Sequence, residues 1–283
     1  MITATQLLTD FIHTAEQRSH YPDEQSWYQA WQSLIEPTLS PTQVALTGGY
    51  HASGAAGLFT AGYQGAVRAI FPEVPTTGWA AFAVSEDKND PIANPPLRLE
   101  QRGNQLYLEG TKSWVAQSRQ VDHLVLTASL DNGEIAAVLL DRHRDEVTMS
   151  HRQQPSFLPA MSQGFLRLKS CAVGASALLS GDRRKQFVKS ESKFVMLAGA
   201  AWLRAQLPPE PLALAAQVDE LLLALIACCQ RQDHTIGELA ECDDQLQSAL
   251  QVIEAHSSIT EIANWQQQRR IFGLYSEGIQ SRR

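Results

Sequence analysis

The spacing of hydrophobic positions changes twice along the chain. From residue 1 to about 75 the apolar side chains recur with the period of an amphipathic helix. From about 76 to 182 short apolar runs alternate with turn-forming residues, which is typical of strands. From about 183 to 283 the helical period returns. The pattern therefore predicts three regions in the order α, β, α.

The N-terminal region reads as a series of helices. A helical run after Ser26 stops near Pro37, and Pro41 stands at a plausible helix start. Small residues dominate from 53 to 70, so this predicted helix can approach its neighbours closely, and Pro72 ends it. The first helix is predicted from the apolar positions Leu7, Leu8, Phe11, Ile12 and Ala15.

The middle region predicts short strands separated by turns. Asn132-Gly133 is a strong hairpin signal, because both residue types tolerate positive φ. Arg102-Gly103-Asn104 marks a second turn. Strands at this spacing favour an antiparallel barrel or sandwich. The predicted strands are 79–84, 97–99, 106–108, 123–128, 134–140 and 165–173.

The C-terminal region is predicted to be helical again. One helix carries Phe187 and Phe194, and Pro208-Pro209 breaks the chain after it. The next helix has Leu221 and Leu225 on its apolar face, and a third helical zone runs from Ile236 to about Phe272. The fold class that follows is α+β: a helical N-terminal region (1–75), a β-domain (76–182) and a helical C-terminal domain (183–283).

The composition is typical of a globular protein and argues against a nucleic-acid-binding one. The chain has 283 residues, of which 44% are hydrophobic and 19% charged, as in an ordinary globular protein. Its net charge of −7 argues against nucleic-acid binding, which needs a basic surface to neutralise phosphates.

The cysteines and the apolar stretches indicate a cytoplasmic protein. None of the four cysteines forms a CxxC pair or a spacing typical of zinc. The N-terminus lacks the pattern of a signal peptide. Charged residues interrupt the most apolar stretch, 212–229, so no membrane span is predicted.

Several short motifs occur in an order that resembles the acyl-CoA dehydrogenase family. The small-residue helix around Ala61-Gly62 is followed by the strand 80–86, which is similar to the family's Ala-Leu-Thr-Glu strand. Gly110-Thr111-Lys112-Ser113-Trp114-Val115 resembles its Gly-x-Lys-x-Trp-Ile turn, and the strand after Asp122 resembles its Ala-Asp-x-x-x-Val strand. The segment 165–168 resembles the strand that closes the family's β-domain.

This resemblance implies FAD as cofactor and an acyl-CoA or similar thioester as substrate. In the family the β-domain holds the flavin ring, and backbone donors stabilise the charge that develops on it. Ala116 stands where the family usually has a threonine that donates to the flavin. The positions that match the family's flavin contacts are Phe82, Val84, Ser85, Trp114 and Ala116.

Two glutamates stand close to positions at which the family places its catalytic base, and at most one of them can serve. Glu191 stands near the start of the helix 191–207, one residue from the position used by isovaleryl-type members. Glu277, in Tyr275-Ser276-Glu277-Gly278, resembles the Tyr-Glu-Gly segment of the common members. Either carboxylate would remove the α-proton of the thioester.

The chain also departs from the family. The Gln-x-x-Gly-Gly-x-Gly loop that grips the adenine half of FAD does not occur after residue 205. Two functions therefore remain open. One is a flavoprotein that oxidises an acyl thioester between Cα and Cβ, as a homo-oligomer. The other is a relative that keeps the fold without catalysis and binds an acyl ligand or a partner protein.

Overall fold

The computed structural model describes residues 3–14, 19–207, 212–231, 233–255 and 265–283. The chain divides into two compact units, which are described separately. A helical unit comprises Met1–Ala69 and Val188–Arg283, and a β unit comprises Ile70–Phe187. The α, β, α order predicted from the sequence is thus the order of the elements, with both helical regions in one unit.

Most helices begin and end close to the predicted limits. The exception is α5, which begins at Arg184, so Glu191 lies about two turns inside the helix and not near its start. Helix α2 starts at a capping box formed by Asp23 and Ser26, and α3 starts at one formed by Ser40 and Gln43. Ala15 and part of the predicted zone 236–272 lie outside the described residues. The helices are α1 (Ala4–Thr14), α2 (Glu24–Leu34), α3 (Pro41–His51), α4 (Ala55–Ile70), α5 (Arg184–Gln206), α6 (Leu212–Gln230), α7 (Ile236–Ala255) and α9 (Trp265–Gln280).

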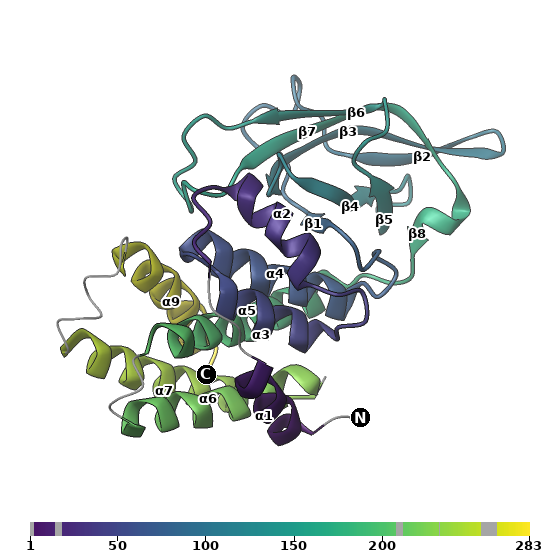
Figure 1. Ribbon diagram of the computed structural model, residues 1–283. Helices are drawn as coiled ribbons and strands as arrows, with labels where there is room; N and C mark the ends of the chain where they lie inside the picture. Colours follow the sequence, from purple (N-terminus) through teal and green to yellow (C-terminus); the bar gives the residue numbers. More distant parts are fainter. Residues whose placement is uncertain (1–2, 15–18, 208–211, 232, 256–264) are drawn as a thin grey trace. The chain divides into compact units, whose positions relative to one another are not determined.

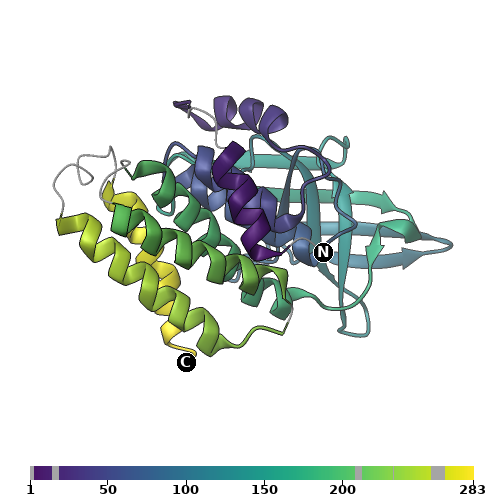
Figure 2. The same ribbon diagram turned by 60° about the horizontal axis from the view of Figure 1, so that its bottom comes forward.

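Glycines let the helices of the helical unit approach α5 closely. A Cβ at Gly62 of α4 would lie 2.4 Å from the Cα of Val195. A Cβ at Gly49 of α3 would lie 2.3 Å from the carbonyl oxygen of Ala198. The small residues of this region therefore serve close helix packing, as their pattern predicted. Figure 2 shows the C-terminal helices, in green to yellow, side by side.

Helix α6 is the most apolar of the helices that the structure describes. Its segment 213–230 is long and apolar enough to cross a membrane by length and composition, with a mean hydropathy of 1.5. Half of this segment is buried within the protein, where α6 packs against α1, α3 and α7. The core helix of a globular protein passes the same test.

The β unit is built on one sheet with the strand order β6-β7-β3-β2-β4-β5-β8, and β1 pairs with β4 off this path (Figure 1). Most pairs are antiparallel, as predicted, but β1 and β2 each run parallel to β4. Strands β6 and β8 were not predicted. The strands are β1 (Trp79–Ala83), β2 (Arg98–Arg102), β3 (Gln105–Ala116), β4 (Val121–Ser129), β5 (Ile135–Asp141), β6 (Val147–His151), β7 (Gln163–Val173) and β8 (Leu178–Leu179).

Both predicted hairpin turns are confirmed, and one predicted turn is wrong. Gly133 has a φ of 82° in the turn between β4 and β5, and Gly103 has a φ of 64° between β2 and β3. The segment 110–114, predicted as a turn, lies inside the continuous strand β3. Gly110 has a φ of 128° and lies where the register between β3 and β7 shifts. A β-bulge needs glycine at such a position, as a turn does, so the two cannot be told apart from the sequence.

Candidate functional site

The site implied by the sequence is centred on the end of β1. Val84 and Ser85 follow directly after the strand and are exposed, Val84 at 37%. The carbonyl of Ser85 accepts a hydrogen bond of 2.8 Å from the backbone N–H of Ser113. The exposed end of β1 is therefore held against β3 while its side chains face outward.

Lys112 fixes this strand end from inside the β unit. Its side chain is 1% exposed, and Nζ donates to the carbonyl of Val84 at 3.2 Å. The same ammonium group lies 2.8 Å from Oε1 of Glu86 and 3.0 Å from Oγ1 of Thr127. Burial lowers the pKa of Lys112, and the bond to Glu86 opposes that shift. All three donors of the ammonium group thus have partners.

Asp122 anchors the other end of β1. Its Oδ2 accepts a hydrogen bond of 2.8 Å from the backbone N–H of Trp79, the first residue of the strand. Gly78 has a φ of 75°, and a Cβ there would lie 2.2 Å from the same oxygen. Two residues of the family-like motifs, Lys112 and Asp122, therefore hold the two ends of one strand.

Trp114 and Ala116 lie at the C-terminal end of β3, which pairs with β7. The indole Nε1 of the half-buried Trp114 donates to Oε1 of Gln163 at 3.0 Å, and Nε2 of Gln163 donates to the carbonyl of Phe157. Ala116 is fully buried opposite Gln163 and has no side-chain donor. The indole ring is thus held in place by a residue that sequence reasoning missed, because a lone glutamine at the start of a strand carries no recognisable signal.

Phe82 is buried against two other aromatic rings of the β unit. Its ring lies between Phe71 and Phe187, with centroid separations of 4.8 and 4.9 Å, and it is 5% exposed. Of the five residues predicted to hold the flavin, Phe82 and Ala116 are buried, so their side chains line no open surface. Val84, Ser85 and Trp114 are the members of that set with exposed or half-exposed side chains.

The two candidate bases differ in surroundings within the helical unit. Glu277 is exposed on α9. Glu191 lies on α5 with its carboxyl group buried, although the residue as a whole keeps some exposure, and Oε1 accepts a hydrogen bond of 3.1 Å from Tyr275 Oη. Burial raises the pKa of Glu191, and the bond from Tyr275 partly offsets the rise.

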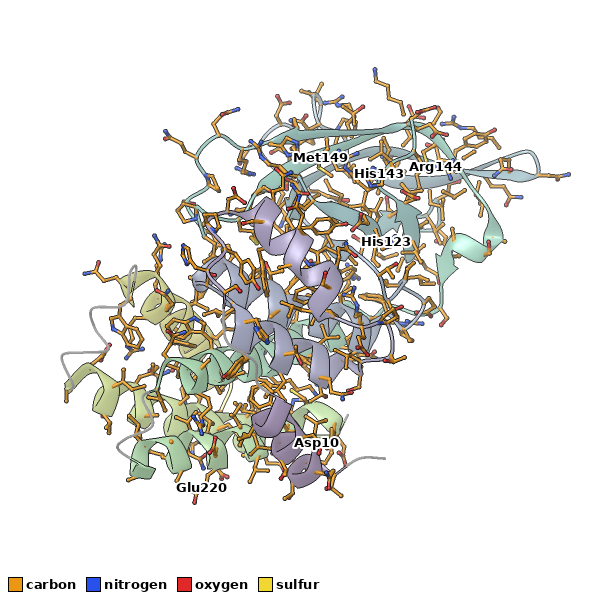
Figure 3. The ribbon with its side chains drawn as sticks, in the orientation of Figure 1. Asp10, His123, His143, Arg144, Met149 and Glu220 are labelled. Carbon is orange, nitrogen blue, oxygen red and sulfur yellow. The ribbon has the colours of Figure 1, made fainter. Side chains whose placement is uncertain are left out.

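The histidines and acidic residues of the described part of the chain form no cluster of three able to hold a metal ion. His143 follows β5, with Nε2 at 3.7 Å from Oδ1 of Asp122 (Figure 3). His123 lies on β4, where Nε2 is 3.2 Å from the carbonyl oxygen of Thr77. Both histidines therefore have partners close to the start of β1 and belong to the local structure of the sheet.

No protein-family model and no curated protein matches this chain. Solved structures match it over almost its whole length at low identity. FkbI, for the biosynthesis of the methoxymalonyl extender unit of Fk520, is 16% identical with a TM-score of 0.59, covering 97% of this chain and 96% of its own. The prolyl acyl carrier protein oxidase AnaB is 13% identical with a TM-score of 0.62, covering 98% and 93%.

An acyl-CoA dehydrogenase from Geobacillus kaustophilus is also 13% identical, with a TM-score of 0.60 over 98% of this chain and 96% of its own. At this identity such matches show the fold alone. The chain therefore has an acyl-CoA dehydrogenase-like α+β fold, as its ordered motifs predicted.

Proposed function

We propose that this protein is a flavoprotein dehydrogenase that oxidises an acyl thioester between Cα and Cβ. The observation that carries the proposal is the buried carboxyl of Glu191, bonded to Tyr275. A buried carboxylate with a raised pKa is suited to proton abstraction near neutral pH. In the structures that match the chain, acyl-CoA dehydrogenases and an acyl carrier protein oxidase share this fold.

The β unit supplies residues that fit a flavin ring. Val84 and Ser85, directly after β1, are exposed residues, and Lys112 and Ser113 fix their backbone carbonyls. A fixed backbone presents its polar groups without reorganisation, which favours a planar ring that takes on negative charge. Trp114, held by Gln163, supplies an aromatic surface. The carbonyls of Val84 and Ser85 already accept bonds, so the proposal relies on backbone N–H groups and on the Ser85 hydroxyl.

In this proposal each unit has its own role. Bound FAD would accept the hydride that leaves Cβ. The carboxylate of Glu191 takes the proton from Cα, and the remaining electron pair forms the double bond. Tyr275 orients the carboxylate through its hydroxyl. Glu277, exposed on α9, is left without a part in the reaction.

The proposal extends to the substrate class, the cellular location and the assembly. Acyl-CoA or an acyl-carrier thioester is the substrate class, since the matching structures include proteins named for both. We further propose a cytoplasmic location, where the four buried free cysteines would stay reduced, and a homo-oligomeric assembly.

Ala116 favours a second candidate function. It is fully buried and offers no hydrogen bond where the family places a donor to the flavin. A protein that keeps the fold and binds an acyl ligand or a partner protein, without redox chemistry, would tolerate this alanine.

Flavin binding separates the two functions. The purified protein should show the absorption bands of a bound flavin, or acquire them when FAD is added and the excess is removed. Trp114→Leu should weaken the uptake of FAD, whereas Tyr107→Leu, at a half-buried aromatic position of the same strand, should not. A folded protein that stays colourless after reconstitution would exclude the flavoprotein dehydrogenase and favour the binding protein without redox chemistry.

A further inference from the structure

In the part of the chain that the structure describes, the first turn of α4 has backbone donors without acceptors. The carbonyl of Gly54 accepts the first intrahelical bond, from Leu58 N–H at 3.0 Å. Among the described residues, no atom accepts from the N–H groups of Ala55, Ala56 or Gly57, and this turn contains no acidic residue. Gly54 precedes the helix and has no side chain to cap it. The turn therefore presents unpaired donors and the positive end of a helix of 16 residues.

A buried amide is directed at this turn from α9. Gln268 is 0% exposed, and its Nε2 lies 3.5 Å from the position that a Cβ would take at Gly54. Neither Nε2 nor Oε1 of Gln268 has a hydrogen-bond partner among the described residues. Buried amides nearly always make such bonds, so an unpaired buried amide at this place points to a ligand.

A second unpaired donor approaches the same turn from α2. Trp27 is 5% exposed, and its indole Nε1 has no partner among the described residues. This nitrogen lies 3.6 Å from the position that a Cβ would take at Gly57. Gly54 and Gly57 are three residues apart and so lie on one side of the helix. The two buried donors therefore converge on the glycine side of α4.

The chemistry of these donors indicates the class of ligand. Indole N–H, amide N–H and backbone N–H groups all donate, and none of them carries a formal charge. Together with the helix end they favour an anion of low charge over a phosphate dianion, for which arginine or lysine is the usual partner. The remaining acceptor, Oε1 of Gln268, suits a hydroxyl next to that anion.

We propose that the first turn of α4, with Gln268 and Trp27, binds the carboxylate of a small organic acid. The carboxylate oxygens accept from the turn, from Nε2 of Gln268 and from Nε1 of Trp27, and a neighbouring hydroxyl donates to Oε1. All of these residues belong to the helical unit, and the site does not depend on flavin or on Glu191.

The test is a titration of the protein, labelled with ¹⁵N-glycine, with sodium glycolate at constant ionic strength set by sodium chloride. The amide signal of Gly57, assigned by its loss in Gly57→Ala, should shift in a saturable manner with glycolate and not with chloride alone. Gln268→Leu should weaken binding by about tenfold or more, because one bond to a charged group is lost. Gln267→Leu, the same change at the exposed neighbouring position, should bind as the wild type does.

Two results would overturn the proposal: a Gly57 signal that does not respond to glycolate, or equal binding by Gln268→Leu and wild type. If Gln268→Leu does not fold, Trp27→Phe provides the same comparison, since it removes Nε1–H and keeps an aromatic ring. Unchanged affinity in that folded variant would equally exclude the site.

Discussion

Tyr275 on α9 donates a hydrogen bond of 3.1 Å to Oε1 of Glu191 on α5. The bond joins residues that are 84 positions apart in the sequence and gives a buried carboxyl group a single fixed orientation. Burial raises the pKa of Tyr275 as well, so the phenol keeps its proton and remains the donor. The hydrogen bond from Tyr275 and the burial of its carboxyl group distinguish Glu191 from Glu277, which is exposed.

The raised pKa of Glu191 predicts a stability effect that depends on pH. Where the folded pKa lies above the unfolded one, stability is full below the unfolded pKa and falls as pH rises through the folded value. Glu191→Gln removes the ionisable group and should therefore raise Tm relative to wild type at about pH 8 but not at about pH 4. Thermal unfolding of both proteins across this range measures the effect.

The control for this prediction is Glu277→Gln, which changes an exposed glutamate in the same way. Because this carboxylate is exposed, its removal should change Tm little. A Glu191→Gln protein whose Tm difference from wild type is independent of pH would show that Glu191 ionises normally.

The buried hydrogen bonds of Lys112 lead to a second prediction, on the stability of the β unit. Lys112→Met keeps the length of the side chain but leaves the carbonyl of Val84 and the Thr127 hydroxyl without their shared donor. The substitution should lower the free energy of unfolding by about 1–3 kcal/mol. It should also loosen the strand end at Val84, so hydrogen exchange there should quicken.

Lys169→Met is the matched control, because Lys169 is exposed on β7. Chemical denaturation should show little change for this variant. Equal stability of the two methionine variants would mean that the buried ammonium group contributes nothing to holding β1.

Because α4 packs closely against α5, adding a single methyl group at their contact should lower the free energy of unfolding. Gly62→Ala would place a Cβ 2.4 Å from the backbone of Val195, so one helix must shift. We expect a loss of about 1–3 kcal/mol in the free energy of unfolding. Gly273→Ala on α9 meets no atom within 4 Å, and should be neutral or stabilising because alanine favours a helix. Denaturant titration compares the two, and a neutral Gly62→Ala would contradict the close contact.

Local patterns predicted most of the fold, because helix caps and glycine turns depend on near neighbours in sequence. Ser40-Pro41 and Asn132-Gly133 are examples, and both were located correctly. The segment 110–114 was placed in a turn because a glycine that serves a bulge looks the same in sequence as one that serves a turn. Strand β8, with only Leu178 and Leu179, is too short to show a period.

The candidate site was predictable only where a motif is continuous in sequence. Val84, Ser85 and Trp114 were predicted in that way, and their role stays a prediction. The contacts that single out Glu191 were not, because its partner Tyr275 arrives from a distant helix and burial of a carboxyl group leaves no local pattern. The same holds for Gln163, which orients Trp114 across the sheet.

The most direct measurement is the anaerobic reduction of the flavin-loaded protein by acyl-CoA thioesters, followed by the loss of flavin absorption. Wild type and Glu277→Gln should be bleached at similar rates by at least one thioester. Glu191→Gln should bind FAD equally well but be bleached at least about 100-fold more slowly, since the base is gone. Failure of every thioester to bleach the wild type, or full activity in Glu191→Gln, would contradict the account.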